Sequence, residues 1–244
     1  MADLPPYLHP FVLPSDPSTR RREGAIDVYP PLEPTDGRRP VVVFVHGGPL
    51  PPEVAPRPRD WPVFHGYGAL AAAAGLVGVT LDHRLHTFAD YATAALDVAA
   101  AVEQARGLAG VDPDRVALWI FSGGGPLAAD YLNAPPPWLR CLALTYPLLG
   151  CPPEFDAEGR FNAVGAVATA PDLPILLTRV GHEFPDFARL QDTFVDTATA
   201  KGATLEVIDV PNGQHGFDNQ DRTEESRAAV RQAMAWVADA LGRG

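Results

Sequence analysis

The stretch Val116-Ala-Leu-Trp-Ile-Phe-Ser-Gly-Gly-Gly-Pro126 decides the fold of this chain. Its apolar residues have the composition of a buried β-strand as far as Phe121, and Ser122 follows at once. Three glycines come next, and residues 127–132 have the composition of a helix. A strand, a tight glycine turn and a helix can lift a serine above the end of a sheet, because only small residues fit where the two elements nearly touch.

Two further segments complete the pattern around this serine. Residues 41–45 form a continuous apolar strand that is followed by His46-Gly47-Gly48-Pro49. Near the carboxyl end of the sequence, residues 205–210 have the composition of a strand, and this strand leads into a loop that contains His215. In chain order the sequence therefore presents a glycine loop, a serine turn and a loop histidine.

This order resembles the α/β-hydrolase superfamily, over the chain from about residue 24 to its end. The HGG loop and the terminal HGFD are similar to the dienelactone hydrolase, acetyl esterase and hormone-sensitive-lipase-like group, and Leu81-Asp-His-Arg-Leu85 resembles the D-Y-R-L of those enzymes. The HGGP form also resembles the catalytic domain of prolyl-oligopeptidase-type peptidases. The resemblance implies a serine hydrolase.

Strands alternate with helices along the chain, which predicts an α/β fold with a doubly wound, mostly parallel sheet. We expect one domain over residues 1–244, with an irregular N-terminal arm over 1–23 and no large cap domain. Strands are expected over 24–29, 41–45, 76–81, 115–121, 141–145, 174–179 and 203–210, and helices over 66–74, 91–106, 127–132, 186–200 and 223–241. Spacing predicts one buried face with Leu96, Ala99, Ala100 and Val102, and another with Val230, Met234 and Val237.

Composition narrows the class of partner. The formal net charge of −11 argues against general binding to nucleic acid or to an anionic membrane surface. No apolar run is long enough for a membrane span, and residues 1–7 lack the pattern of a secretion signal. The two cysteines favour reduced thiols in a cytoplasmic protein. The oligomeric state is not determined by the sequence.

Ser122 and His215 are the expected nucleophile and general base. A serine hydroxyl is a weak nucleophile at neutral pH and needs an adjacent base. A phosphate cradle would use the same turn, but no Walker lysine or dinucleotide fingerprint accompanies it. The histidine lies between Gly213 and Gly216, in a loop that can reach across the edge of the sheet.

The acid that would orient His215 has two candidates. It is expected just after the strand that ends near residue 179, in the run Thr178-Arg-Val-Gly-His-Glu-Phe-Pro-Asp186. In the esterases that the chain resembles, the acid falls two residues after a glycine here, which selects Glu183. Asp186 is the alternative. Asp218 is too close in sequence to His215 for its carboxylate to reach the side of the imidazole that faces away from the serine and orient the ring there.

The oxyanion hole is expected to consist of backbone amides. Gly123, after the nucleophile, supplies one, and Gly48 supplies the other, because Pro49 has no N–H. One residue departs from the G-x-S-x-G pattern, since Ile120 stands where the first glycine is expected. A bulky residue there should push strand and helix apart unless the three glycines compensate.

The remaining expectations concern ligands and substrate. His83 and His86 lack a third ligand at metal spacing, so we expect no metal and no cofactor. The substrate-binding walls are expected to contain Trp61, Phe64, Phe155 and Phe161. The sequence predicts a hydrolase of small carboxylic esters acting through an acyl-enzyme. A peptidase or amidase, and a nearly inactive small-ligand-binding member of the fold, are the alternatives.

Overall fold

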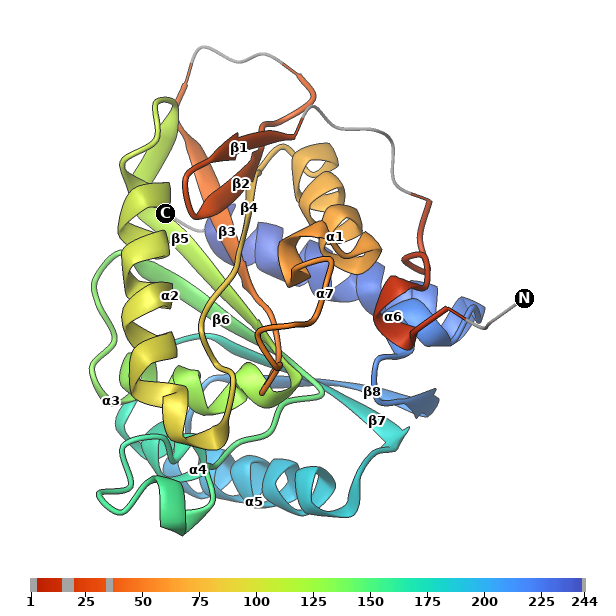
Figure 1. Ribbon diagram of the computed structural model, residues 1–244. Coiled ribbons are helices and arrows are strands. Elements are labelled where there is room, and N and C mark those ends of the chain that lie inside the picture. The colour runs from red at the N-terminus through yellow and green to blue at the C-terminus, as the bar shows by residue number, and fades with distance from the viewer. Residues whose placement is uncertain (1–3, 15–19, 34–36, 243–244) are drawn as a thin grey trace.

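An eight-stranded sheet forms the centre of the molecule (Figure 1). The structure is a computed structural model that describes residues 4–14, 20–33 and 37–242. The sheet order is β1-β2-β4-β3-β5-β6-β7-β8. The strands are β1 (Arg21–Glu23), β2 (Ile26–Tyr29), β3 (Arg39–Val45), β4 (Val77–Leu81), β5 (Val111–Phe121), β6 (Leu139–Thr145), β7 (Ile175–His182) and β8 (Leu205–Gln214).

The sheet is mostly parallel, as predicted. Strand β2 pairs antiparallel with β1 and with β4, and every other pairing is parallel. The carboxyl ends of β3, β5, β6, β7 and β8 therefore meet at one edge, where loops bring chemistry-bearing residues together.

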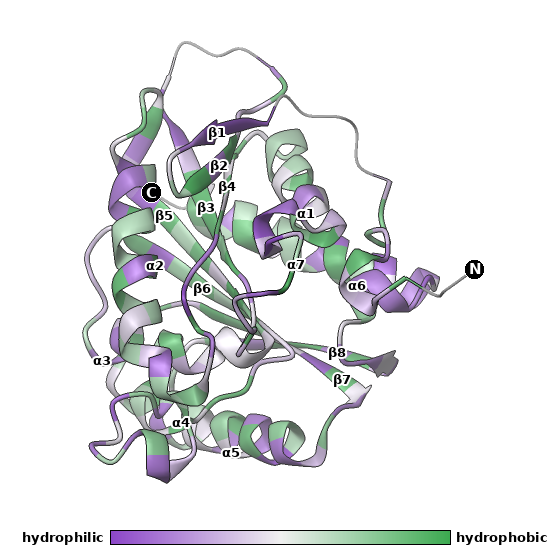
Figure 2. Ribbon diagram, viewed as in Figure 1, coloured by the Kyte–Doolittle hydropathy of each residue, from purple (hydrophilic) through white to green (hydrophobic). Residues whose placement is uncertain are grey.

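Helices cover both faces of the sheet (Figure 1). On one face lie α1 (Pro62–Ala73), α6 (Phe217–Gln220) and α7 (Glu224–Gly242), and on the other lie α2 (Tyr91–Arg106), α3 (Ala128–Asn133), α4 (Ala163–Ala166) and α5 (Pro185–Lys201). Strands β3, β5 and β6 are apolar along most of their length because both of their faces are buried (Figure 2). Among the described residues, no helix combines the length and apolar character needed to cross a membrane.

Two local predictions are wrong. The predicted face of α2 is wrong at Leu96, which is 69% exposed, and at Ala99 and Ala100, which are also exposed. Val102 is buried as predicted, but it shares the buried face with Ala94, Val98 and Ala101. The N-terminal arm is not irregular throughout, since Arg21–Glu23 pairs with β2. Residues 1–3 and 15–19 of that arm lie outside the described residues.

The predicted face of the last helix is confirmed. Val230, Met234 and Val237 are all buried in α7, and they pack in the core between this helix and the sheet.

Candidate active site

Ser122 lies directly at the end of β5 in a strained backbone conformation. Its φ is +50°, in the left-handed region that residues with a side chain usually avoid. Residues Ser122–Leu127 form a 3₁₀ turn and α3 begins at Ala128, so the predicted helix over 127–132 is present but starts one residue later. Such strain persists only where the surrounding structure imposes it, and it concentrates at functional sites.

The glycines of the turn are required by close contacts. A Cβ on Gly123 would overlap the carbonyl oxygen of Gly48, and a Cβ on Gly47 would lie 2.9 Å from the Cβ of Ser122. The HGG loop therefore packs directly against the serine turn. Tyr91, on α2, also holds the serine turn: its hydroxyl donates a hydrogen bond to the backbone carbonyl of Gly123 over 2.7 Å.

Ile120 fits at the turn because a glycine faces it. Its side chain is fully buried in the core on the α2 face. A Cβ on Gly124 would lie 3.1 Å from Cγ2 of Ile120 and 2.7 Å from the carbonyl oxygen of His46. The space that a side chain would need at residue 124 is thus taken by the isoleucine.

Ser122, His215 and Glu183 form a chain of hydrogen bonds. The Oγ of Ser122 lies 2.7 Å from Nε2 of His215, and Nδ1 of His215 lies 2.7 Å from Oε1 of Glu183. The Glu183 side chain is 1% exposed and that of His215 is 19% exposed. With Nδ1 protonated, the imidazole donates to the carboxylate and accepts the serine proton.

Glu183 is held from two further directions. The backbone N–H of Phe184 donates to Oε1 over 2.8 Å. The side chain of Gln191, on α5, donates to Oε2 over 3.3 Å and to the carbonyl of Pro147 over 3.0 Å. Sequence reasoning missed Gln191, because a lone glutamine among the polar residues of an amphipathic helix carries no local signal.

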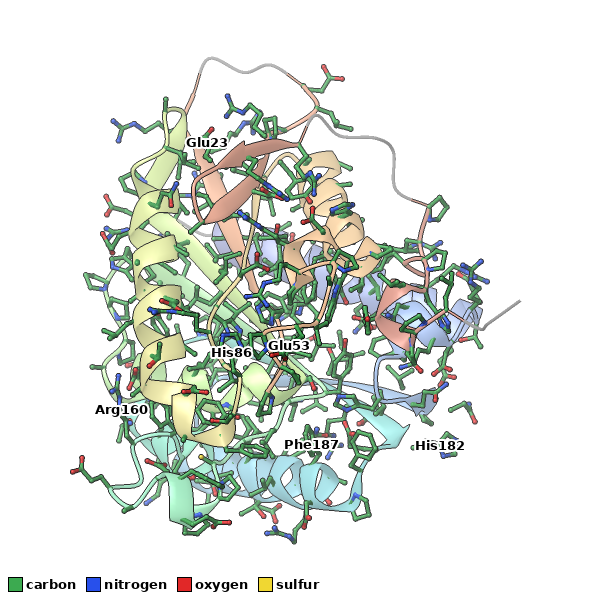
Figure 3. The ribbon with its side chains drawn as sticks, viewed as in Figure 1. Glu23, Glu53, His86, Arg160, His182 and Phe187 are labelled. Carbon is green, nitrogen blue, oxygen red and sulfur yellow. The ribbon has the colours of Figure 1, made fainter. Side chains whose placement is uncertain are left out.

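Asp186, the alternative acid, lies elsewhere. Its side chain is 86% exposed and faces Arg189 at 3.5 Å on the first turn of α5. Helix α5 begins at Pro185, so Asp186 is carried on the helix surface while Glu183 remains in the loop. His182, one residue before Glu183, is exposed at the carboxyl end of β7 (Figure 3).

A cavity of about 370 Å³ lies beside Ser122 and His215. Trp61 and Phe64, two of the residues expected in the substrate-binding walls, line it together with Gly47 and Gly48 of the glycine loop. Tyr7 also lines it and stacks on Trp61 with ring centroids 4.8 Å apart. No signal in the irregular N-terminal segment pointed to Tyr7.

Phe155 and Phe161 do not line this cavity, so their predicted place beside Ser122 is wrong. Phe161 is buried against Tyr91, and Phe155 stacks on Phe88 with centroids 5.9 Å apart. Their segment lies on the α2 side of the sheet, whereas the cavity is on the α1 side.

A second cavity of about 590 Å³ contains Leu148 and Phe187 in its lining. The N–H of Leu148 donates to the carbonyl of Ser122 over 2.9 Å, and the Phe187 ring lies 5.2 Å from that of His215. Phe187 stands at the start of α5, below the carboxyl ends of the strands (Figure 3). Ser122 and His215 themselves line only the first of these two cavities.

His46 and His83 form a stacked, buried pair beneath the glycine loop. Their ring centroids are 3.7 Å apart, and the N–H of His83 donates to Nε2 of His46 over 3.2 Å. Burial lowers the pKa of His83 to about 4 and that of His46 well below its usual value. Because both rings are neutral, they stack without charge repulsion, and the stacked pair supports the glycine loop above it. His86 instead contacts the carbonyl of Leu50.

In the part of the chain that the structure describes, no three His, Cys, Asp or Glu side chains gather in a group that could hold a metal ion.

Comparison with solved structures identifies the fold. The carboxylesterase EstE1, cloned from a metagenomic library, aligns with a TM-score of 0.78 and 20% identity, over 94% of this chain and 92% of its own. A thermostable esterase from Pseudomonas putida ECU1011 aligns with a TM-score of 0.68 and 21% identity, over 92% and 83%. Esterase 2 of Thermogutta terrifontis, phosphonylated by cyclosarin, aligns with a TM-score of 0.68 and 19% identity, over 89% and 88%.

Comparison by sequence gives a different result: no family description matches the chain, and no curated protein matches it. The identities to the solved structures are all near 20%, so the shared property is the arrangement of the backbone. The sheet order, the helices on both faces and these alignments together show that the chain has the α/β-hydrolase fold of solved esterases.

Proposed function

We propose that this protein is a serine hydrolase that cleaves small carboxylic esters through an acyl-enzyme on Ser122. The observation that carries the proposal is the hydrogen-bonded chain from Ser122 through His215 to Glu183. A nucleophile, a base and a buried acid in this geometry recur on several unrelated folds that catalyse acyl transfer. The esterase names of the solved structures with this fold agree with it.

In the first half of the reaction, Oγ of Ser122 attacks the carbonyl carbon while Nε2 of His215 takes the hydroxyl proton. Glu183 stabilises the imidazolium that forms. The N–H groups of Gly48 and Gly123 would donate to the oxyanion of the tetrahedral intermediate. The C–O bond to the alcohol then breaks, and the alcohol leaves with the proton from His215.

In the second half, His215 takes a proton from water, and the resulting hydroxide attacks the acyl carbon. The bond between that carbon and Oγ breaks, the proton returns to Ser122, and the carboxylic acid leaves. Every proton is carried by one imidazole, so no cofactor is needed for this reaction.

Fluorophosphonate labelling tests the proposal, since such reagents form a covalent bond only with an activated serine. We expect one phosphonyl group per chain on Ser122, located by peptide mass spectrometry. Ser122→Ala should abolish the adduct and the burst of p-nitrophenol from p-nitrophenyl acetate, while its thermal unfolding midpoint stays close to that of the unmodified protein.

The outcome also separates the alternatives. Labelling with turnover of p-nitrophenyl esters but not of aminoacyl anilides supports the esterase, and the reverse preference would indicate a peptidase or amidase. A folded protein with neither label nor turnover would indicate a ligand-binding member of the fold and would refute the proposal.

A further inference from the structure

A second buried carboxylate, Asp218, lies three residues after His215 and takes no part in the bonds to Ser122. Its side chain is fully buried. Both carboxylate oxygens accept hydrogen bonds from phenol hydroxyls: Tyr67 donates to Oδ2 over 2.9 Å, and Tyr146 donates to Oδ1 and Oδ2 over 2.8 and 2.9 Å. A buried charge is costly unless it is well hydrogen-bonded, so this arrangement fixes the two phenols firmly.

Tyr146 connects this carboxylate to the candidate base. The Tyr146 ring is packed against the imidazole of His215, with centroids 4.6 Å apart. Tyr146 also follows β6 in the way that Ser122 follows β5, on the neighbouring strand of the sheet. With its phenol fixed by Asp218, the ring is a rigid surface beneath the imidazole.

The backbone gives an independent indication. Among the described residues, Ser122 and Tyr146 are the two non-glycine residues with positive φ, at +50° and +38°. Packing alone seldom requires such a conformation for a tyrosine, and strain of this kind is concentrated at functional sites. Tyr146 is thus held at an energetic cost in a position that touches His215.

We propose that Asp218 is a positioning residue for His215 and acts through Tyr146. The carboxylate fixes the phenol, the phenol ring limits the rotation of the imidazole, and the negative charge favours the imidazolium that forms during the reaction. This inference rests on the proposed function, because Asp218 would assist the formation of the His215 imidazolium in that reaction.

The surroundings of Asp218 define what a pH experiment would report. The titratable groups that face it are Tyr67 from α1, Tyr146 after β6 and His215 after β8, while the charge of Glu183 acts on Tyr146. Burial and the adjacent carboxylate raise the pKa of both tyrosines well above their usual value, so they stay neutral donors.

Tyr146→Phe and Tyr67→Phe form a matched pair that tests the proposal. Each removes one phenol bond to the same carboxylate, but only Tyr146 contacts His215. We expect Tyr146→Phe and Asp218→Asn to lower kcat for p-nitrophenyl acetate about tenfold with little change in KM, a part of the 10²–10⁴-fold that general base catalysis contributes. Tyr67→Phe should lower the thermal unfolding midpoint and affect kcat much less.

The pH profile provides the second measurement. In Asp218→Asn the acidic limb of kcat/KM should move to lower pH, because the base loses a nearby negative charge that favours its protonated form. Equal losses of kcat in the two tyrosine variants, or an unshifted acidic limb in Asp218→Asn, would show that the carboxylate only stabilises the fold.

Nitrogen NMR of the His215 ring separates this inference from the proposed function, because it needs no reaction. The midpoint of the imidazole titration should fall in Asp218→Asn and stay near that of the unmodified protein in Tyr67→Phe. If fluorophosphonate labelling fails while this shift is seen, the proposed function is wrong but the coupling of Asp218 to His215 holds. An unchanged midpoint in Asp218→Asn overturns the inference.

Discussion

At the scale of single residues, this protein places two buried carboxylates near one imidazole and gives them different surroundings. Glu183 bonds directly to Nδ1 of His215, whereas Asp218 bonds to two tyrosine hydroxyls. The first arrangement fixes the tautomer of the imidazole, and the second fixes the ring packed against it. Sequence position alone could not assign these roles, because both acids follow a strand at the same edge of the sheet.

Glu183→Gln should lower kcat for p-nitrophenyl acetate by about 10²–10⁴-fold, because the imidazolium loses its charged partner and the tautomer is no longer fixed. Asp186→Asn is the matched control and should leave kcat close to that of the unmodified protein, since the Asp186 side chain is 86% exposed. Steady-state kinetics on both variants provide the check. The opposite ranking would move the acid to Asp186.

Asp218 should make the stability of the protein depend on pH. Burial raises its pKa from 3.8 to about 6, so the folded protein holds a proton that the unfolded chain has already released. The free energy of unfolding should therefore fall as the pH rises from about 4 to about 6, by about 3 kcal/mol from this group. Urea unfolding at several pH values measures it.

Asp218→Asn is the reference protein for that measurement, since every other titrating group is common to both chains. The stability of the unmodified protein relative to the variant should decline across this pH range. A relative gain on raising the pH would contradict the assignment. Keeping Asp218 ionised at neutral pH thus lowers the stability of the fold, which is a typical cost of a functional group.

At the scale of elements, the turn from β5 to α3 shows how a departure from a motif is accommodated. Ile120 pairs in register with Val45 on β3 and Leu144 on β6, so its backbone position is fixed from both sides. The space for its side chain comes from Gly124 across the turn. Strand and turn have therefore adapted to each other, and the isoleucine is part of the core.

Ile120→Gly restores the common pattern but should destabilise the protein. The lost side chain leaves a cavity in a packed core, which costs about 2–5 kcal/mol of unfolding free energy, while Ile120→Val should cost about 0.5–1.5 kcal/mol. Urea unfolding of both variants measures these values. A joint rise in the unfolding midpoint and the esterase rate would mean that Ile120 strains the turn.

At the scale of the whole molecule, segments distant in the chain enclose the site. The N-terminal segment docks on the α1 face, where the N–H of Val12 donates to the carbonyl of Asp218 and the side chain of Asn219 donates to the carbonyl of Pro6. A Cβ on Gly66 would overlap the Phe11 ring, so this glycine makes room for the segment. The N-terminal segment thereby supplies Tyr7 to the lining of the cavity beside Ser122.

Acetyl to butyryl esters should be hydrolysed faster than decanoyl or longer esters. The cavity of about 370 Å³ is walled by Tyr7, Trp61 and Phe64 and suits a compact apolar group. Measuring kcat/KM across an acyl-length series tests this, and Tyr7→Ala should shift the maximum to longer chains. Leu4→Ala, at a residue 59% exposed, is the control. A maximum at long chains in the unmodified protein would refute the interpretation of the cavity.

The sequence by itself determined the elements and the order of the key residues along the chain. Apolar runs bounded by glycine and proline marked the central strands, because strands buried on both faces need continuous apolar side chains. The glycines beside Ser122 marked the turn, because no other residue fits there. The buried face of α2 was predicted correctly only at Val102, since an alanine-rich helix has little contrast between its sides.

The tertiary structure decided which side chains meet. Glu183 and Asp186 are three residues apart, but the start of α5 at Pro185 carries only the second onto the surface. Tyr7, Tyr146 and Gln191 reach the site through packing between segments far apart in sequence, and Phe155 and Phe161 are carried to the opposite face. Local patterns record the period of a strand or helix, whereas contacts across a sheet depend on the strand order and on which face each crossover covers.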